Sequence, residues 1–107
     1  MAQAHIKKID RAVRVAGINV YPEHAAKIPR EYPDVRECAV RPMAGRNGTR
    51  LKAFIVSKPG SDPRALLEKV SNFARERLSN AEFPASITIG DALPRNEMGK
   101  LADWDIL

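Results

Sequence analysis

The fold is decided by the stretch VRECAVRPMAGRNGTRLKAFIVSK, which spans residues 35–58. Its two ends, Val35–Arg41 and Leu51–Lys58, are rich in apolar and β-branched residues, so each is predicted to form a strand. The segment Gly45–Gly48 between them contains the glycines and the asparagine that favour a hairpin loop. The stretch therefore predicts two strands joined by a hairpin turn.

The chain before this hairpin is predicted to form a smaller hairpin and a helix. Arg11–Ala16 alternates polar and apolar residues, as a strand with one solvent-facing side does. We expect Gly17–Asn19 to be the turn and Val20–Tyr21 to pair back as a short second strand. Pro22 suits the first position of a helix. This helix must end before Pro33, because the residue preceding a proline is disfavoured in the α region.

The chain after the hairpin is predicted to add a second helix and a last strand. Apolar residues recur at helical spacing over Arg64–Leu78, and Asp62 can cap the start of that helix. Ser86–Ile89 is β-branched and is predicted to be a strand, while Trp104 is expected to pack the C-terminal tail down. The order β-β-α-β-β-α-β predicts a small α+β domain, with helices packed on a small, mainly antiparallel sheet.

The composition fits one globular domain over residues 1–107, because 44% hydrophobic and 29% charged residues is an ordinary mix. No apolar run approaches the roughly 20 residues of a membrane span, and the first residues lack the apolar core of a signal peptide. The single cysteine, Cys38, favours a reducing cytoplasm and is expected to be buried or half-buried. His5 and His24 lack metal-ligand spacing, so we expect no metal site and an exposed His24.

The stretch with the clearest chemistry is Leu93-Pro94-Arg95-Asn96-Glu97-Met98-Gly99-Lys100. It places a lysine, directly after a glycine, at the tip of a loop that follows a β-like run. A lysine on a loop is a mobile cation, which suits it to stabilising charge that develops on a phosphate or a carboxylate. The pattern therefore makes Lys100 the leading candidate for a catalytic residue.

This pattern and the earlier stretch Asp10–Pro22 together resemble the C-terminal domain of the acyl-adenylate-forming (AMP-binding) enzymes. That superfamily includes acyl- and aryl-CoA ligases, adenylation domains and luciferases. Three stretches are more similar to bacterial 4-coumarate–CoA ligase-like proteins: Val15–Pro22, Arg50–Phe54 and Gly99–Trp104. The resemblance runs from about Lys8 to Leu107, which is nearly the whole chain.

The resemblance implies a lid domain in an ATP-dependent acyl- or aryl-CoA ligase. Carboxylate and Mg²⁺-bound ATP would give acyl-AMP, and the thiol of CoA would then displace AMP. Lys100 would serve adenylation, with Gly99 allowing close approach of the backbone. Gly17 would line the pantetheine path, Asp10 would be the hinge, and Lys8 would lie near the nucleotide ribose, where the family commonly has arginine.

The resemblance also implies partners that lie outside this chain. An N-terminal adenylation domain of the same polypeptide would make most of the contacts with ATP and Mg²⁺ and would bind the carboxylic acid. The isolated chain is therefore expected to be inactive. The whole enzyme is expected in the cytoplasm. Residues 1–7 are expected to be an inter-domain hinge segment or an added leader. Five positions depart from the family pattern and indicate a divergent branch: His24 and Ala26 replace glutamates, Ala81-Glu82 replaces Tyr-Lys, and Asp103 replaces an arginine.

Two other functions are compatible with parts of the sequence. The net charge of +5 and the GXXG pattern of Gly45–Gly48 would suit a nucleic-acid-binding α+β module, although a KH domain needs that loop between helices. An adenylation domain that acts on a carrier protein, in place of CoA, is the other alternative. The sequence gives neither the carboxylic acid nor the oligomeric state.

Overall fold

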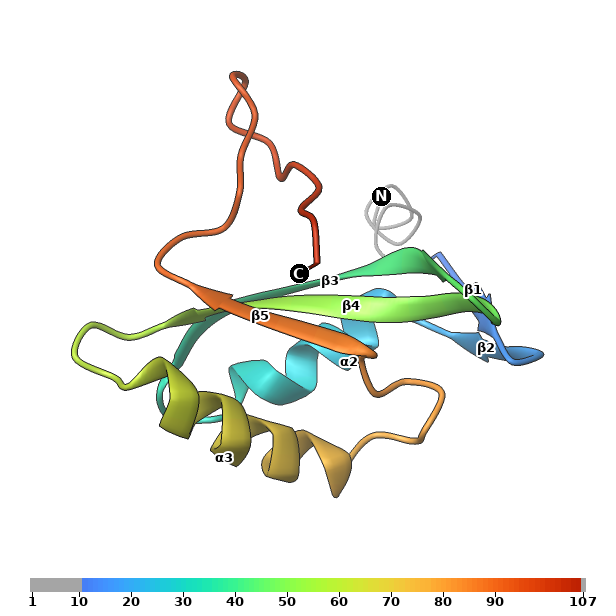
Figure 1. Cartoon of the computed structure of the whole chain (residues 1–107), viewed down its shortest axis with the longest axis horizontal. Coiled ribbons are helices and arrows are strands. Elements are labelled where there is room, and N and C mark those ends of the chain that lie inside the picture. The colour runs from blue at the N-terminus through green and yellow to red at the C-terminus, as the bar shows by residue number, and fades with distance from the viewer. Residues whose placement is uncertain (1–10, 107) are drawn as a thin grey trace, which may run out of the picture.

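A computed structural model describes residues 11–106 of the chain. The predicted α+β class and the predicted order of elements are both confirmed (Figure 1). Along the chain the elements are β1 (Val13–Val15), β2 (Ile18–Val20), α2 (Pro22–Arg30), β3 (Val35–Gly45), β4 (Gly48–Ser57), α3 (Pro63–Arg75) and β5 (Ser86–Gly90).

The strands form two sheets. β1 and β2 make a two-stranded antiparallel sheet, and the larger sheet has the order β3-β4-β5. β3 and β4 pair antiparallel over their whole length, whereas β4 and β5 pair parallel. The parallel pair follows from the connection: α3 carries the chain back along the sheet, so β5 starts at the same end as β4. The predicted, mainly antiparallel pairing is confirmed, with β5 as the parallel exception.

The core lies between the larger sheet and the helices, which cover one face of it (Figure 1). Leu51, Ala53 and Ile55 alternate along β4 and are all buried, since every second residue of a strand faces the same side. They pack against apolar residues of both helices, including Leu66 and Val70 of α3. The chain after β5 rises on the opposite face of the sheet, away from the helices (Figure 1).

The local boundaries differ from the prediction at the first turn. The turn is Ala16–Gly17, not Gly17–Asn19, because Ile18 and Asn19 pair with Val15 and Arg14. Ala16 has φ of 52° and Gly17 has φ of 81°, and two successive left-handed residues form the tight turn that matches the twist of a hairpin. Alanine rarely adopts a positive φ, so the sequence does not indicate that Ala16 belongs to the turn.

The other predicted boundaries hold more closely. α2 ends at Arg30, before Pro33, and the side chain of Asp62 accepts a hydrogen bond from the backbone N–H of Arg64 at the start of α3. α3 ends at Arg75, a few residues earlier than predicted. Gly45–Gly48 joins two strands as predicted, so the KH arrangement of this loop between helices is absent from the described structure. None of the described helices is long and apolar enough to cross a membrane.

Candidate functional site

The chain after β5 projects from the sheet as a hairpin (Figure 1), and Lys100 lies between the bridged residues Arg95 and Leu101 of that hairpin. The two legs meet at an antiparallel bridge between Arg95 and Leu101, and Ala102 N–H donates to Pro94 C=O at 2.9 Å. Asn96 closes the tip: its Oδ1 accepts the N–H of Met98 at 2.8 Å and the N–H of Lys100 at 3.1 Å. The backbone that carries Lys100 is therefore held in one conformation by its own hydrogen bonds.

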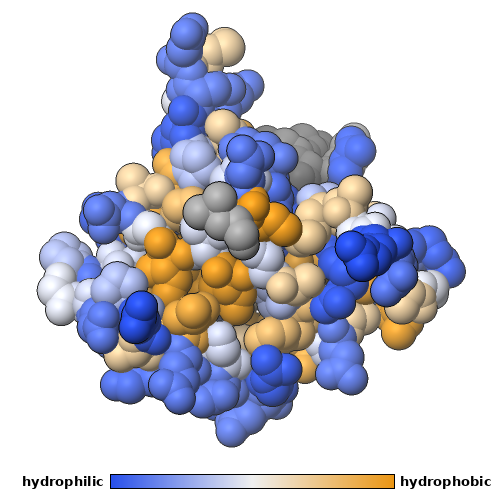
Figure 2. Space-filling model, in the orientation of Figure 1, coloured by the Kyte–Doolittle hydropathy of each residue, from blue (hydrophilic) through white to orange (hydrophobic). Residues whose placement is uncertain are grey.

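The side chain of Lys100 points into solvent from this fixed backbone. Lys100 is exposed and forms no ion pair with any residue between 11 and 106. Its neighbour Met98 is 80% exposed, and Gly99 has φ of 82°, a conformation that favours glycine. Figure 2 shows the projecting hairpin covered mainly by hydrophilic residues. The hairpin thus presents an uncompensated cation away from the domain's own core.

The base of the hairpin is joined to the sheet by charged side chains that are not among the predicted site residues. Arg41 Nη2 donates to Leu101 C=O at 3.0 Å, and Lys52 Nζ lies 2.9 Å from Asp103 Oδ1. The hydrogen bond from Lys52 and the nearby Arg41 hold the pKa of Asp103 below its ordinary value. Lys52 is the one charged residue in the otherwise apolar run Leu51–Val56. A lysine in such a run is the sequence signal that could have indicated a buried, paired charge.

Trp104 packs the tail against the sheet, as predicted. It is 8% exposed, and its ring meets Phe54 edge-to-face at a centroid distance of 5.6 Å. Lys52 Nζ lies 4.8 Å from the centre of the same ring and donates a hydrogen bond to Trp104 C=O. The leg that follows Lys100 is therefore attached to the face of the sheet opposite the helices.

Gly17 lies at a different place, on the tip of the β1–β2 hairpin. The guanidinium of Arg14 donates to Gly17 C=O at 2.9 Å and holds the turn. Beside it is a hollow of about 300 Å³, lined mainly by apolar atoms of Val15, Ala16, Ile18, Arg50, Asn80 and Ala81. Figure 1 shows this turn and the Lys100 hairpin at separate parts of the molecule. The structure does not bring Gly17 and Lys100 together.

Of the remaining predicted residues, Cys38 lies within the described range of the structure, whereas Asp10 and Lys8 do not. Asp10 and Lys8 precede the described range, so the structure does not place the hinge. Cys38 is 2% exposed, and burial raises the pKa of its thiol to about 12, which confirms the prediction of a core residue. Among residues 11–106, no three His, Cys, Asp or Glu side chains form a group that could hold a metal ion.

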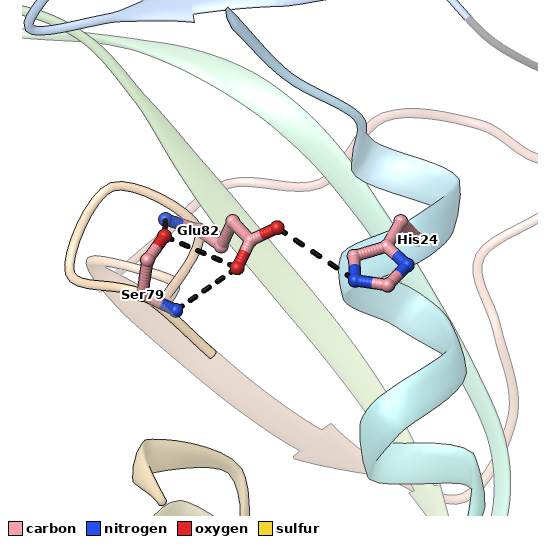
Figure 3. Close-up of polar contacts among 3 residues, drawn as sticks. All are labelled: His24, Ser79 and Glu82. Atoms are coloured by element: carbon pink, nitrogen blue, oxygen red, sulfur yellow. Dashed lines mark hydrogen bonds and ion pairs between the residues drawn. The ribbon is translucent and has the colours of Figure 1, made fainter. Parts of the chain in front are cut away.

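Two departures from the family pattern meet in space (Figure 3). His24 on α2 has a side chain that is 57% exposed, as predicted, and its Nε2 lies 3.7 Å from Glu82 Oε2. The other carboxylate oxygen of Glu82 accepts bonds from the N–H and the hydroxyl of Ser79, at 2.9 and 3.1 Å. These contacts join α2 to the loop before β5, so the two substituted positions have a common structural role.

The chain is thus a small α+β domain whose projecting hairpin carries an exposed lysine. Residues 28–100 match the family described as the AMP-binding enzyme C-terminal domain. The chain belongs to this family. The resemblance that the two sequence stretches indicated is therefore confirmed.

The chain is similar in sequence to ligases and in fold to solved structures. The chain is 40% identical over 95 residues to a 4-coumarate–CoA ligase of Halorhodospira halophila, covering 88% of this chain and 24% of that protein. It is 33% identical over 95 residues to the fatty acid–[acyl-carrier-protein] ligase ScoC of Streptomyces coeruleorubidus, covering 88% and 18%. The crystal structure of the ATP-bound RpMatB-BxBclM chimera B1 superposes with a TM-score of 0.75 at 32% identity, covering 89% and 19%. The chain spans a quarter or less of these proteins.

Proposed function

We propose that the chain is the C-terminal mobile domain of an ATP-dependent acyl- or aryl-CoA ligase and supplies its adenylation lysine. The observation that carries this proposal is the Lys100 hairpin. Its backbone is fixed by Asn96, while the ammonium group has no charge partner among the described residues. A preorganised cation of this kind stabilises developing negative charge without reorganisation at the moment of reaction.

In the first step, a carboxylate oxygen of the substrate forms a bond to the α-phosphorus of ATP as the bond to pyrophosphate breaks. Negative charge builds on the phosphoryl oxygens and on the leaving group. Lys100 would hold the two reactants together and offset that charge. ATP and Mg²⁺ would be bound mainly by an N-terminal adenylation domain, together with the carboxylic acid.

In the second step, the thiol sulfur of CoA attacks the carbonyl carbon of acyl-AMP, and AMP leaves. The hollow beside Gly17 is lined mainly by apolar atoms, which suits the narrow and largely uncharged pantetheine arm. Gly17 has no side chain, and apart from its two chain neighbours no described residue lies within 4 Å of the position that a Cβ would take. Its backbone can therefore border such a path closely.

Lys100 and Gly17 would serve the same carbonyl group from separate parts of the domain. One orientation of the domain would not bring both to it, so the domain must reorient between the steps. We place the hinge at Asp10 and a nucleotide contact at Lys8, within a leading segment that connects to the N-terminal domain. The lone, buried Cys38 supports a cytoplasmic location.

A carrier-protein phosphopantetheine is the alternative acceptor. The similarity to ScoC, which is described as a fatty acid–[acyl-carrier-protein] ligase, supports this second candidate. Both acceptors end in the same pantetheine thiol, so the hollow beside Gly17 would serve either. Thioester formation with CoA, compared with a phosphopantetheinylated carrier protein, distinguishes them.

The proposal is tested in a ligase fusion, in which this chain replaces the matching C-terminal residues of the Halorhodospira halophila ligase. The fusion should catalyse 4-coumarate-dependent ATP–pyrophosphate exchange, while the same ligase without a C-terminal domain should not. Lys100→Ala should slow exchange by about 10²-fold or more and should spare thioester formation from supplied acyl-AMP. Lys69→Ala, which removes an exposed lysine on α3, is the matched control.

Two outcomes would contradict the proposal. An inactive wild-type fusion would show that the chain does not act as the C-terminal domain of the ligase. Equal loss of both half-reactions in Lys100→Ala would show that Lys100 is not specific to adenylation.

The hinge is tested separately. Asp10→Pro should impair one half-reaction more than the other, because proline restricts φ at that position. Wild-type rates in both half-reactions would refute the hinge.

A further inference from the structure

Lys52 is a buried lysine whose described polar contacts all lie in the C-terminal tail. It is 6% exposed and sits in β4 between the buried residues Leu51 and Ala53. Burying an ammonium group is costly unless it is paired and hydrogen-bonded. Among the described residues its ion-pair partner is Asp103, at 2.9 Å, and its hydrogen bond goes to Trp104 C=O. The tail must stay in place for this charge to be compensated.

The anchored residues belong to the same leg of the hairpin as Lys100. Leu101 directly follows Lys100 and forms the bridge to Arg95. The same leg continues through Ala102 to Asp103. Arg41 contacts this leg twice, through Leu101 C=O at 3.0 Å and Asp103 Oδ1 at 3.6 Å. Arg41 and Lys52 are direct partners across β3 and β4, so two cations of neighbouring strands hold one leg.

We propose that Lys52 and Asp103 are positioning residues, which fix the direction in which the hairpin presents Lys100. This inference rests on the proposed function, because Lys100 is the group that is positioned. Lys52 does not approach a reacting atom. It acts through Asp103 and Trp104, which set where the hairpin leaves the sheet, and the hydrogen bonds at the tip carry that direction to Lys100.

The pair differs from an ordinary stabilising contact because it lies outside the main core. The helices pack on one face of the sheet, and the Asp103 contact is on the other (Figure 1). Asp103 itself is exposed, with 66% of its side chain accessible. Loss of the pair should therefore free the hairpin while the sheet and helices stay folded. The effect on the position of Lys100 can then be measured apart from any effect on folding.

The first test uses the 107-residue chain, whose single tryptophan, Trp104, reports on the tail. Asp103→Asn should shift Trp104 emission to longer wavelength and speed amide exchange at Ala102 by about tenfold, with far-UV circular dichroism unchanged. Lys52→Met should loosen the tail in the same way, and it carries no buried charge that could unfold the domain. Asp105→Asn is the matched control, since Asp105 forms no ion pair with a described residue. Unchanged emission and exchange in both variants would overturn the proposal.

The second test uses the ligase fusion and separates position from stability. Asp103→Asn should lower the rate of 4-coumarate-dependent exchange by about tenfold and leave thioester formation from supplied acyl-AMP unchanged, as misplacement of one catalytic group does. Asp103→Glu, which keeps the charge, should recover part of the exchange. Equal loss of both half-reactions would show a structural role only and would overturn the proposal.

Failure of this inference is distinguishable from failure of the proposed function. A wild-type fusion with no exchange would refute the role of Lys100, and the positioning role with it. Full exchange in Asp103→Asn and Lys52→Met, in a fusion that still depends on Lys100, would refute the positioning role alone.

Discussion

Asn96 and Lys100 are joined in both directions across the tip of the projecting hairpin. The N–H of Asn96 donates to Lys100 C=O at 2.9 Å, and Asn96 Oδ1 accepts the N–H of Lys100 at 3.1 Å. The asparagine therefore closes the turn with its backbone and its side chain together, as asparagine commonly does in turns. A lysine that follows a proline-containing segment with no such closure would sample many directions.

Removing the Asn96 side chain should disorder the tip and weaken catalysis by Lys100. In the ligase fusion, we expect Asn96→Ala to slow ATP–pyrophosphate exchange by about tenfold, because the cation loses its fixed position. The domain should stay folded, since the lost bonds are exposed to water. Asn47→Ala, in the β3–β4 turn, is the control, and a similar loss in both variants would contradict this interpretation.

Three glycines allow a matched comparison of backbone strain with function. Gly17, Gly60 and Gly99 have φ of 81°, 88° and 82°, and apart from the chain neighbours no described residue lies within 4 Å of a Cβ placed on any of them. Alanine should therefore cost each site about 1–2 kcal/mol of backbone strain, without a clash. In the fusion, Gly99→Ala should slow adenylation and Gly17→Ala should slow thioester formation. Gly60→Ala should change thermal stability alone, and a uniform effect of all three on both half-reactions would contradict the assignment.

Acid should release the tail through Asp103. The hydrogen bond from Lys52 lowers the pKa of Asp103 below 3.8, so the paired carboxylate stabilises the folded state. That contribution is fully present above the unfolded pKa and is lost as pH falls through the lower, folded pKa. Trp104 emission should thus be constant from neutral pH down to about pH 4 and shift to longer wavelength below it. If the Asp103→Asn variant showed the same change of Trp104 emission below pH 4, the change would come from another titrating group and the prediction would be wrong.

The Cys38 thiol should be inert in the folded protein. Burial raises its pKa to about 12 and leaves 2% of the residue exposed, so the reactive thiolate is scarce and inaccessible at pH 8. A disulfide reagent such as dithionitrobenzoate should react with one thiol per chain in denaturing guanidinium chloride and hardly at all in buffer. Rapid reaction of the native protein would contradict the buried environment.

Local patterns in the sequence were enough to predict the elements and their order. Helix α3 follows from apolar spacing and the Asp62 cap, and the β3–β4 hairpin follows from two apolar runs around Gly45–Gly48. The candidate catalytic loop was also readable, because Gly99 and Lys100 are adjacent in the chain. All of these signals lie within a few residues of one another, where steric preferences and periodicity act directly.

The sequence by itself determined the type and order of the elements, and it put Lys100 on a loop after the last strand. Only the tertiary structure decided what holds that lysine in place. Lys52 and Asp103 are about fifty residues apart, and nothing local to either one indicates that they pair. His24 and Glu82 likewise meet only because α2 packs near the loop before β5. The energy of such contacts depends on burial and distance after folding, and these quantities are set by the packing of whole elements.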